Sequence, residues 1–168
     1  MSELVPSEDW KGSHRLDPNM YFAEVYRLLS LVLASPAIAT HYEKDSGRWF
    51  GIGWQEAEIS RSLIHVASYY RVKYDDGSWE HAKWLHKDFR GVGELVDSRG
   101  RAQPLEFREA CNKVIHALRI HFDGEPDTPE KLGSLTPIVH FYGSKGKQEW
   151  KAVLNVVEFC RAAANVIV

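Results

Sequence analysis

The chain has 168 residues, of which 44% are hydrophobic and 12% aromatic, so it can bury one good core and is expected to form one domain. Its formal net charge of -2 argues against a constitutive, sequence-blind nucleic-acid-binding protein, because such proteins carry a basic surplus that neutralises phosphates. The charge does not exclude an enzyme that meets RNA briefly. The two cysteines, Cys111 and Cys160, do not make a disulfide framework and fit a reducing, cytoplasmic compartment.

The apolar pattern does not predict a membrane span. The longest apolar run, Leu28 to Ala39, is interrupted by Ser30, Ser35 and Pro36 and falls short of the roughly 20 residues that a spanning helix requires. Residues 1–9 are acidic and lack both the basic and the apolar regions of a secretory signal. We therefore expect a soluble protein with no membrane partner.

The first expected helix begins at Asp17-Pro18, where an N-capping residue precedes a proline at the first helical position. Its apolar residues recur at helical spacing, and Pro36 is expected to end it. Residues 36–53 are rich in glycine and are expected to form a connection, with a short helical extension over residues 38–44 as an alternative.

The second expected helix runs from about residue 54 to residue 74, because apolar residues recur there at intervals of three or four. Asp75-Asp76-Gly77 is expected to end it. A shorter helix is expected over residues 79–89, and four glycine and serine positions predict a loop over residues 91–100.

A third helix is expected to start near Pro104 and to end before Gly124, again from its helical period. After it the apolar pattern changes to alternation. Residues 138–142 alternate, residues 143–146 have the composition of a turn, and residues 150–156 form a second extended run, which together predict a β-hairpin. Residues 159–168 return to an alanine-rich helical pattern.

These elements predict a mainly α fold, namely a helical bundle with a C-terminal β-hairpin and a closing helix. Helical periods cover most of the chain, and only one pair of runs alternates. We expect a single domain over residues 1–168. Within it, residues 1–17 are expected to be an extended N-terminal segment, residues 18–124 the bundle, and residues 134–168 the hairpin with its helix.

The third expected helix carries the residues best suited to chemistry. Asn112 and His116 are four residues apart and share a helix face, and Arg108 lies two turns before His116, about 12 Å along the axis. Imidazole exchanges protons near neutral pH and a guanidinium neutralises a phosphate, so this stripe suits phosphodiester chemistry. Hydrogen bonding at the edge of a core uses the same residue types, so a structural role is the alternative.

The run Arg108-Glu-Ala-Cys-Asn-Lys-Val-Ile-His116-Ala resembles the signature helix of the HEPN superfamily (higher eukaryote and prokaryote nucleotide-binding domains), which often reads Arg-Asn, three residues, His. The resemblance implies an all-helical, often dimeric domain. Many members are metal-independent ribonucleases of toxin, antiphage and stress systems, in which Arg and His from two subunits meet across the dimer interface. By this resemblance His116 would be the acid/base or orienting group, and Asn112 its polar neighbour.

The chain departs from the family pattern at one important position. Cys111 stands directly before Asn112, where the family usually has its catalytic arginine. A cysteine cannot supply that positive charge. Arg108 is the nearest upstream arginine, and the seven residues between it and His116 exceed the family's spacing. The predicted hairpin is a further departure from an all-helical family.

Two further groups of charged residues are candidate site residues. Glu58 and Arg61 on the second expected helix could support the stripe in an antiparallel bundle, although a surface pair three residues apart explains them as well. A cluster of lysines near the hairpin turn could contact a phosphate backbone, or could protect the hairpin edge from aggregation. These are Lys145, Lys147 and Lys151.

No metal and no cofactor are expected, because the closest histidine pairs are five residues apart and lie on different helix faces. Three hypotheses remain. The first is a HEPN-like, non-catalytic binding or dimerisation module in a bacterial defence or toxin-antitoxin context, with a second copy or another protein as its partner. The second is a metal-independent ribonuclease in which Arg108 works with His116 on RNA. The third is a globular domain whose stripe only ties helices together.

Overall fold

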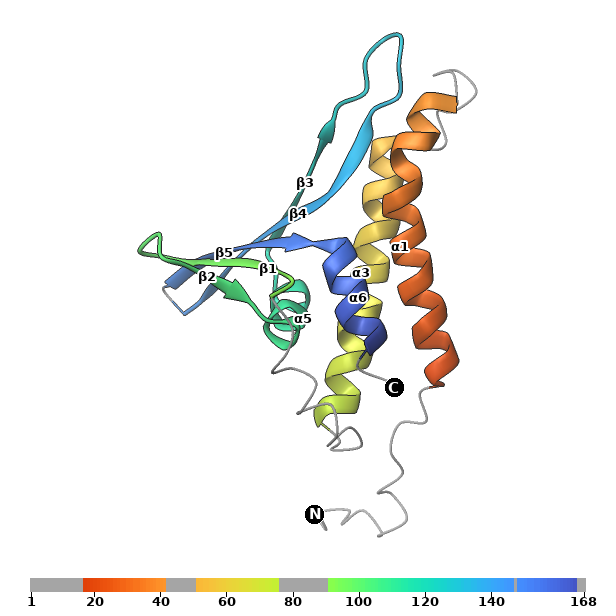
Figure 1. Cartoon of the computed structure of the whole chain (residues 1–168). Coiled ribbons are helices and arrows are strands. Elements are labelled where there is room, and N and C mark those ends of the chain that lie inside the picture. The colour runs from red at the N-terminus through yellow and green to blue at the C-terminus, as the bar shows by residue number, and fades with distance from the viewer. Residues whose placement is uncertain (1–16, 42–50, 76–90, 147, 166–168) are drawn as a thin grey trace, which may run out of the picture.

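The computed structural model describes residues 17–41, 51–75, 91–146 and 148–165. These residues form four helices and a five-stranded antiparallel sheet, which is an α+β fold (Figure 1). The prediction of a mainly α bundle with one hairpin is therefore wrong. Residues 18–124 were expected to form helices joined by loops, but strands β1 and β2 and most of β3 lie in this range.

Helix α1 spans Pro18–His41 and begins as predicted, since Asp17 Oδ1 accepts a hydrogen bond from the backbone N–H of Asn19 at 2.9 Å. It does not end at Pro36. Ser35 and Ala39 on either side of that proline are buried, and Ser35 Oγ accepts a hydrogen bond from the backbone N–H of Leu135 at 2.8 Å. Packing on the sheet thus keeps the last turn helical despite the missing proline N–H.

By length and composition, α1 could cross a membrane, and no other helix among the described residues could. A core helix passes the same test. Along one face of α1, Tyr21, Val25, Leu28 and Val32 are buried in the core, which is typical of a helix inside a folded domain.

Helix α3 spans Ile52–Asp75, which confirms the second predicted helix. It packs along α1 and buries apolar residues at helical spacing, among them Ile59, Leu63, Val66 and Tyr70. The predictions for residues 42–50 and for the short helix over residues 79–89 lie outside the described residues.

The predicted loop over residues 91–100 contains a strand instead. Strand β1 spans Gly93–Asp97, and a turn leads to β2, Ala102–Leu105. A Cβ at Gly93 would lie 2.0 Å from the carbonyl oxygen of Val153, so glycine there permits close approach of the neighbouring strand β5. Gly93 therefore serves strand pairing, whereas Gly100, with a positive φ of 76°, lies in the turn as its loop signal predicted.

The structure divides the third predicted helix into a shorter helix and a strand. Helix α5 spans only Phe107–Ile115, and Arg119–Glu125 form strand β3. The backbone N–H of Leu118 donates to the Tyr142 carbonyl at 2.8 Å, so the chain joins the sheet directly after the helix. The apolar residues among 119–122 fit the alternation of a strand as well as the period of a helix, and pairing with the neighbouring strand selects the strand.

The predicted hairpin and closing helix are present. Strands β4, Ser134–Lys145, and β5, Gln148–Asn155, pair antiparallel, and α6 follows at Val156–Asn165. Asn155 Oδ1 accepts a hydrogen bond from the backbone N–H of Val157 at 3.0 Å and so caps α6. The strand order is β2-β1-β5-β4-β3.

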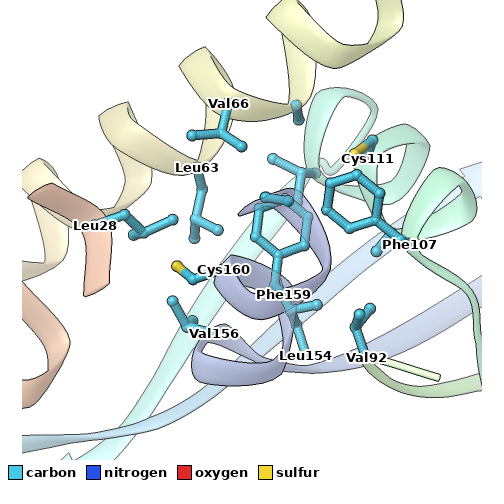
Figure 2. Close-up of a cluster of buried hydrophobic side chains, with 14 of the residues drawn as sticks. Leu28, Leu63, Val66, Val92, Phe107, Cys111, Leu154, Val156, Phe159 and Cys160 are labelled. Atoms are coloured by element: carbon cyan, nitrogen blue, oxygen red, sulfur yellow. The ribbon is translucent and has the colours of Figure 1, made fainter. Parts of the chain in front are cut away.

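The helices gather on one side of the sheet, which we call its inner face (Figure 1). Strand residues that point inward are buried with the helices, among them Leu95, Val139, Phe141, Ala152 and Leu154. Figure 2 shows how α5 and α6 meet in this core, where the rings of Phe107 and Phe159 lie 4.8 Å apart between centroids. On the opposite, outer face, the described strand residues are half-buried or exposed.

Candidate functional site

Two of the three predicted stripe residues line one hollow of about 510 Å³. It lies between α3, α5 and the end of the β4–β5 hairpin, and we call it the α5 hollow. Asn112 and His116 contribute to it from α5 and its C-terminal end. Its full lining is Arg71, Glu109, Asn112, Lys113, His116, Ser144, Lys145 and Trp150.

Asn112 holds the neighbouring charged groups in place. Its side-chain oxygen accepts a hydrogen bond from the Arg71 guanidinium on α3, and its Nδ2 donates to Glu109 Oε2 at 3.1 Å. These two bonds use both ends of the amide, so its orientation is fixed. Asn112 therefore positions Arg71 at the wall of the hollow.

Lys113 is held beside a carboxylate and an aromatic ring. Its Nζ lies 3.1 Å from Glu109 Oε1 and 4.3 Å from the centroid of the Trp150 ring. Burial raises the pKa of Glu109, but the hydrogen bonds from Asn112 and Lys113 lower it more, so its pKa lies below the usual value. Glu109 is thus a carboxylate at neutral pH and partly offsets the cations around it.

Trp150 forms a packed wall of the hollow. A Cβ at Gly143 on the paired strand would lie 2.1 Å from Trp150 Cζ2, so the ring occupies the space of the missing side chain. The ring thereby contacts both strand β4 and Lys113, which leaves it poorly placed to stack on a ligand.

His116 ends α5. Its backbone N–H donates to the carbonyl of Asn112 at 3.0 Å, and the chain then turns toward β3. The residue is exposed, so its imidazole is accessible at the rim of the hollow. His116 is therefore not buried at the edge of the core.

The structure does not bring Arg108 into the hollow with His116. Arg108 is exposed on α5 and is not part of the lining, whereas Arg71 is. Sequence reasoning missed Arg71 because it precedes Asn112 by 41 residues on another helix. Nothing in the local sequence distinguished Arg71 from the other charged residues of the second predicted helix.

Cys111 belongs to the core of the domain. Its side chain is 0% exposed and points into the core, as Figure 2 shows. Burial raises the pKa of its thiol well above the usual value. An arginine at this position would place its charge in the core of the monomer, so the chain could not present the family's catalytic arginine at this point of the helix.

Glu58 and Arg61 do not support the stripe. Arg61 Nη2 lies 3.1 Å from Glu58 Oε2 and 3.3 Å from Glu24 Oε1 on α1, so these charges join α1 to α3. Arg61 precedes Arg71 by ten residues, about 15 Å along α3, and therefore lies away from α5. The alternative of a surface ion pair describes them better.

Two further hollows adjoin the first. One of about 390 Å³ and one of about 250 Å³ share Trp150 with the α5 hollow. Six lysines and arginines line the three hollows, against three carboxylates. The cations are Arg71, Arg99, Arg101, Lys113, Arg119 and Lys145, and the carboxylates are Asp97, Glu109 and Glu149. A basic surface is thus concentrated here in a chain whose net charge is -2.

Of the predicted lysine cluster, Lys145 lies in the α5 hollow and Lys151 lies on the outer face of the sheet. Lys147 is outside the described residues. Within the described part of the chain, no group of three or more His, Cys, Asp and Glu side chains could hold a metal ion. Comparisons of the chain with protein families, curated proteins and solved structures give no match.

Proposed function

We propose that the protein binds a nucleic-acid strand, namely RNA, without cutting it. The α5 hollow holds the phosphates of that strand. One observation carries this proposal: Arg71, Lys113 and Lys145, from three different elements, converge on one hollow. Guanidinium and ammonium groups bind phosphate oxygens through charge-assisted hydrogen bonds. Glu109 is the single carboxylate among the lining residues.

The fixed position of Arg71 supports this proposal. Because Asn112 already holds its guanidinium, less side-chain entropy is lost when Arg71 meets a ligand. The accessible lysine at the hollow is Lys145, which is exposed near the hairpin turn. The hollow thus combines two cations held in place, Arg71 and Lys113, with the exposed Lys145.

A binding role fits the lining better than catalysis does. Acid-base cleavage of a phosphodiester needs groups that can accept and donate a proton in the transition state. Glu109 is held as a carboxylate by Lys113 and Asn112, which weakens it as a base. His116 is the one histidine among the described lining residues, so it has no second imidazole beside it to exchange the other proton.

Salt-dependent binding tests the proposal. Fluorescence anisotropy would follow a labelled single-stranded RNA of about 12 nucleotides, at several salt concentrations between about 50 and 200 mM. We expect Lys145→Gln to lower affinity and to reduce the slope of log K against log salt by about 0.7, the value for one lost phosphate contact on a single strand. Lys131→Gln is the matched control, because Lys131 pairs with Glu125 away from the hollow.

The proposal is wrong if the wild-type protein fails to bind the strand, or if both lysine variants lose the same affinity. An equal loss would mean that only the overall charge matters. Circular dichroism of each variant would show that its fold is intact.

The second candidate function is metal-independent RNA cleavage, with Arg71 rather than Arg108 beside His116. It is favoured by one observation, which is that both residues line the same hollow. With EDTA present, cleavage that His116→Ala abolishes and Arg108→Ala leaves unchanged would establish this function. RNA that binds and stays intact would establish the binding module.

A further inference from the structure

The outer face of the sheet carries a row of two cations around one aromatic ring. Arg119 on β3 is directly opposite Tyr142 on β4, and Tyr142 is directly opposite Lys151 on β5. Arg119 Cζ lies 5.2 Å from the centroid of the Tyr142 ring, and Lys151 Nζ lies 5.8 Å from it. We call these three residues the outer row.

The outer row stands on a face that the described helices do not cover. Tyr142 and Lys151 are half-buried and Arg119 is exposed, whereas inward residues of the same strands, such as Phe141 and Ala152, are buried in the core. An aromatic ring flanked by cations on an open sheet fits a ligand that combines flat rings with negative charge.

A groove connects the outer row to the α5 hollow. The hollow of about 390 Å³ is lined by Arg119 and Tyr142 and also by Ser144 and Trp150, which belong to the α5 hollow as well. Strand β3 pairs with β4 only as far as Tyr142. Beyond that point the β4 edge at Ser144 is exposed, so the groove passes from the inner face around this edge to the outer face.

We propose that the outer row is a base-stacking platform for a single-stranded nucleic acid whose phosphates lie in the α5 hollow. The strand crosses the β4 edge at Ser144, one base stacks at Tyr142, and Arg119 and Lys151 contact the flanking phosphates. This inference rests on the proposed function, since it places a second part of the same ligand.

The chemistry selects a single strand. A base can stack on a side chain only when its own face is free, and in a duplex both faces are covered by neighbouring base pairs. Trp150 does not belong to the outer row, because its ring fills the space above Gly143 on the paired strand and faces α5. Glu149 lines the same groove and would repel a phosphate there, so the attraction must come from Arg119 in the groove and from Lys151 beside Tyr142.

The test compares ligands with and without bases. Anisotropy would measure three labelled 12-nucleotide probes: single-stranded RNA, DNA of the same sequence, and an abasic sugar-phosphate strand. The variants are Tyr142→Ala and Tyr142→Phe. Tyr26→Ala is the matched control, since Tyr26 is an exposed tyrosine, 74% accessible, on α1.

We expect Tyr142→Ala to weaken binding of the base-bearing strands by between about 5-fold and 150-fold, the range for one lost base-aromatic stack. Tyr142→Phe keeps the ring and should stay within about twofold of wild type. The abasic strand should bind wild type and Tyr142→Ala equally, and Tyr26→Ala should bind every probe as wild type does. Comparison of the RNA and DNA probes shows which strand the platform prefers.

Two results would overturn the inference, and they are distinguishable. If wild type binds the RNA, Lys145→Gln weakens it and Tyr142→Ala does not, then the platform is wrong and the phosphate site stands. If wild type binds none of the probes, the proposed function fails, and the platform fails with it.

Discussion

Arg71 on α3 donates a hydrogen bond to the side-chain oxygen of Asn112 on α5, so residues 41 positions apart in the chain form one wall of the hollow. Asn112 belongs to the polar stripe that resembles the HEPN signature, and Arg71 does not. The hollow therefore receives a guanidinium from α3, whereas the residue before Asn112 on α5 is the buried Cys111.

Asn112→Ala should lower the free energy of unfolding by about 1–3 kcal/mol, because it leaves the half-buried Arg71 and Glu109 groups without this partner. Urea denaturation followed by circular dichroism measures the change. Asn19→Ala is the control, since Asn19 is exposed at the start of α1 and its replacement should change stability by less than about 0.5 kcal/mol. Equal effects of the two substitutions would contradict a structural role for Asn112.

Gly143→Ala should destabilise the protein by about 1–3 kcal/mol, because the new methyl group would displace the Trp150 ring. It should also weaken RNA binding, since Lys113 packs on the Trp150 ring and would move when the ring moves. Thermal unfolding and anisotropy measure the two effects. Gly53→Ala is the matched control: nothing lies within 4 Å of its Cβ, and alanine inside α3 should stabilise by up to about 1 kcal/mol.

Asp97 should make stability depend on pH in the acid range. Hydrogen bonds from the backbone and side chain of Arg101 lower the pKa of Asp97, and the backbone N–H of Arg99 adds to this effect. A carboxylate with a depressed folded-state pKa stabilises the fold above its unfolded pKa of about 3.9, and this contribution is lost as pH falls through the folded value. The melting temperature of wild type should therefore exceed that of Asp97→Asn at pH 7, and the difference should shrink below about pH 4. A difference that stays constant down to about pH 2 would show that the charge of Asp97 is not responsible.

Cys111 and Cys160 should resist thiol reagents in the folded protein. Both are free and buried, and burial raises the pKa of the Cys160 thiol to about 12, so little thiolate forms at pH 8. A chromogenic disulfide reagent should titrate no thiol in the native state and two after unfolding in guanidinium. Rapid labelling of one native thiol would show that its part of the core opens readily.

Local sequence signals determined several elements correctly. The Asp17-Pro18 start of α1, the length of α3, the β4–β5 hairpin and the closing helix α6 all follow from caps, helical period and alternation. Asn112 and His116 both line the α5 hollow, although His116 caps α5 and does not lie within it. These features depend only on residues close in the chain.

Tertiary structure decided the rest. Residues 93–97 and 119–125 form strands because β5 and β4 supply partners for their backbone groups, and neither partner is visible in the local pattern. Helix α1 continues through Pro36 because the sheet packs against its last turn. Helix α3 packs against both α1 and α5, and this packing decides which of its turns meets each helix. Arg71 therefore reaches the hollow at α5, whereas Arg61 pairs with Glu24 on α1. Residue types therefore determined which groups were available for chemistry, and long-range packing determined which of them meet.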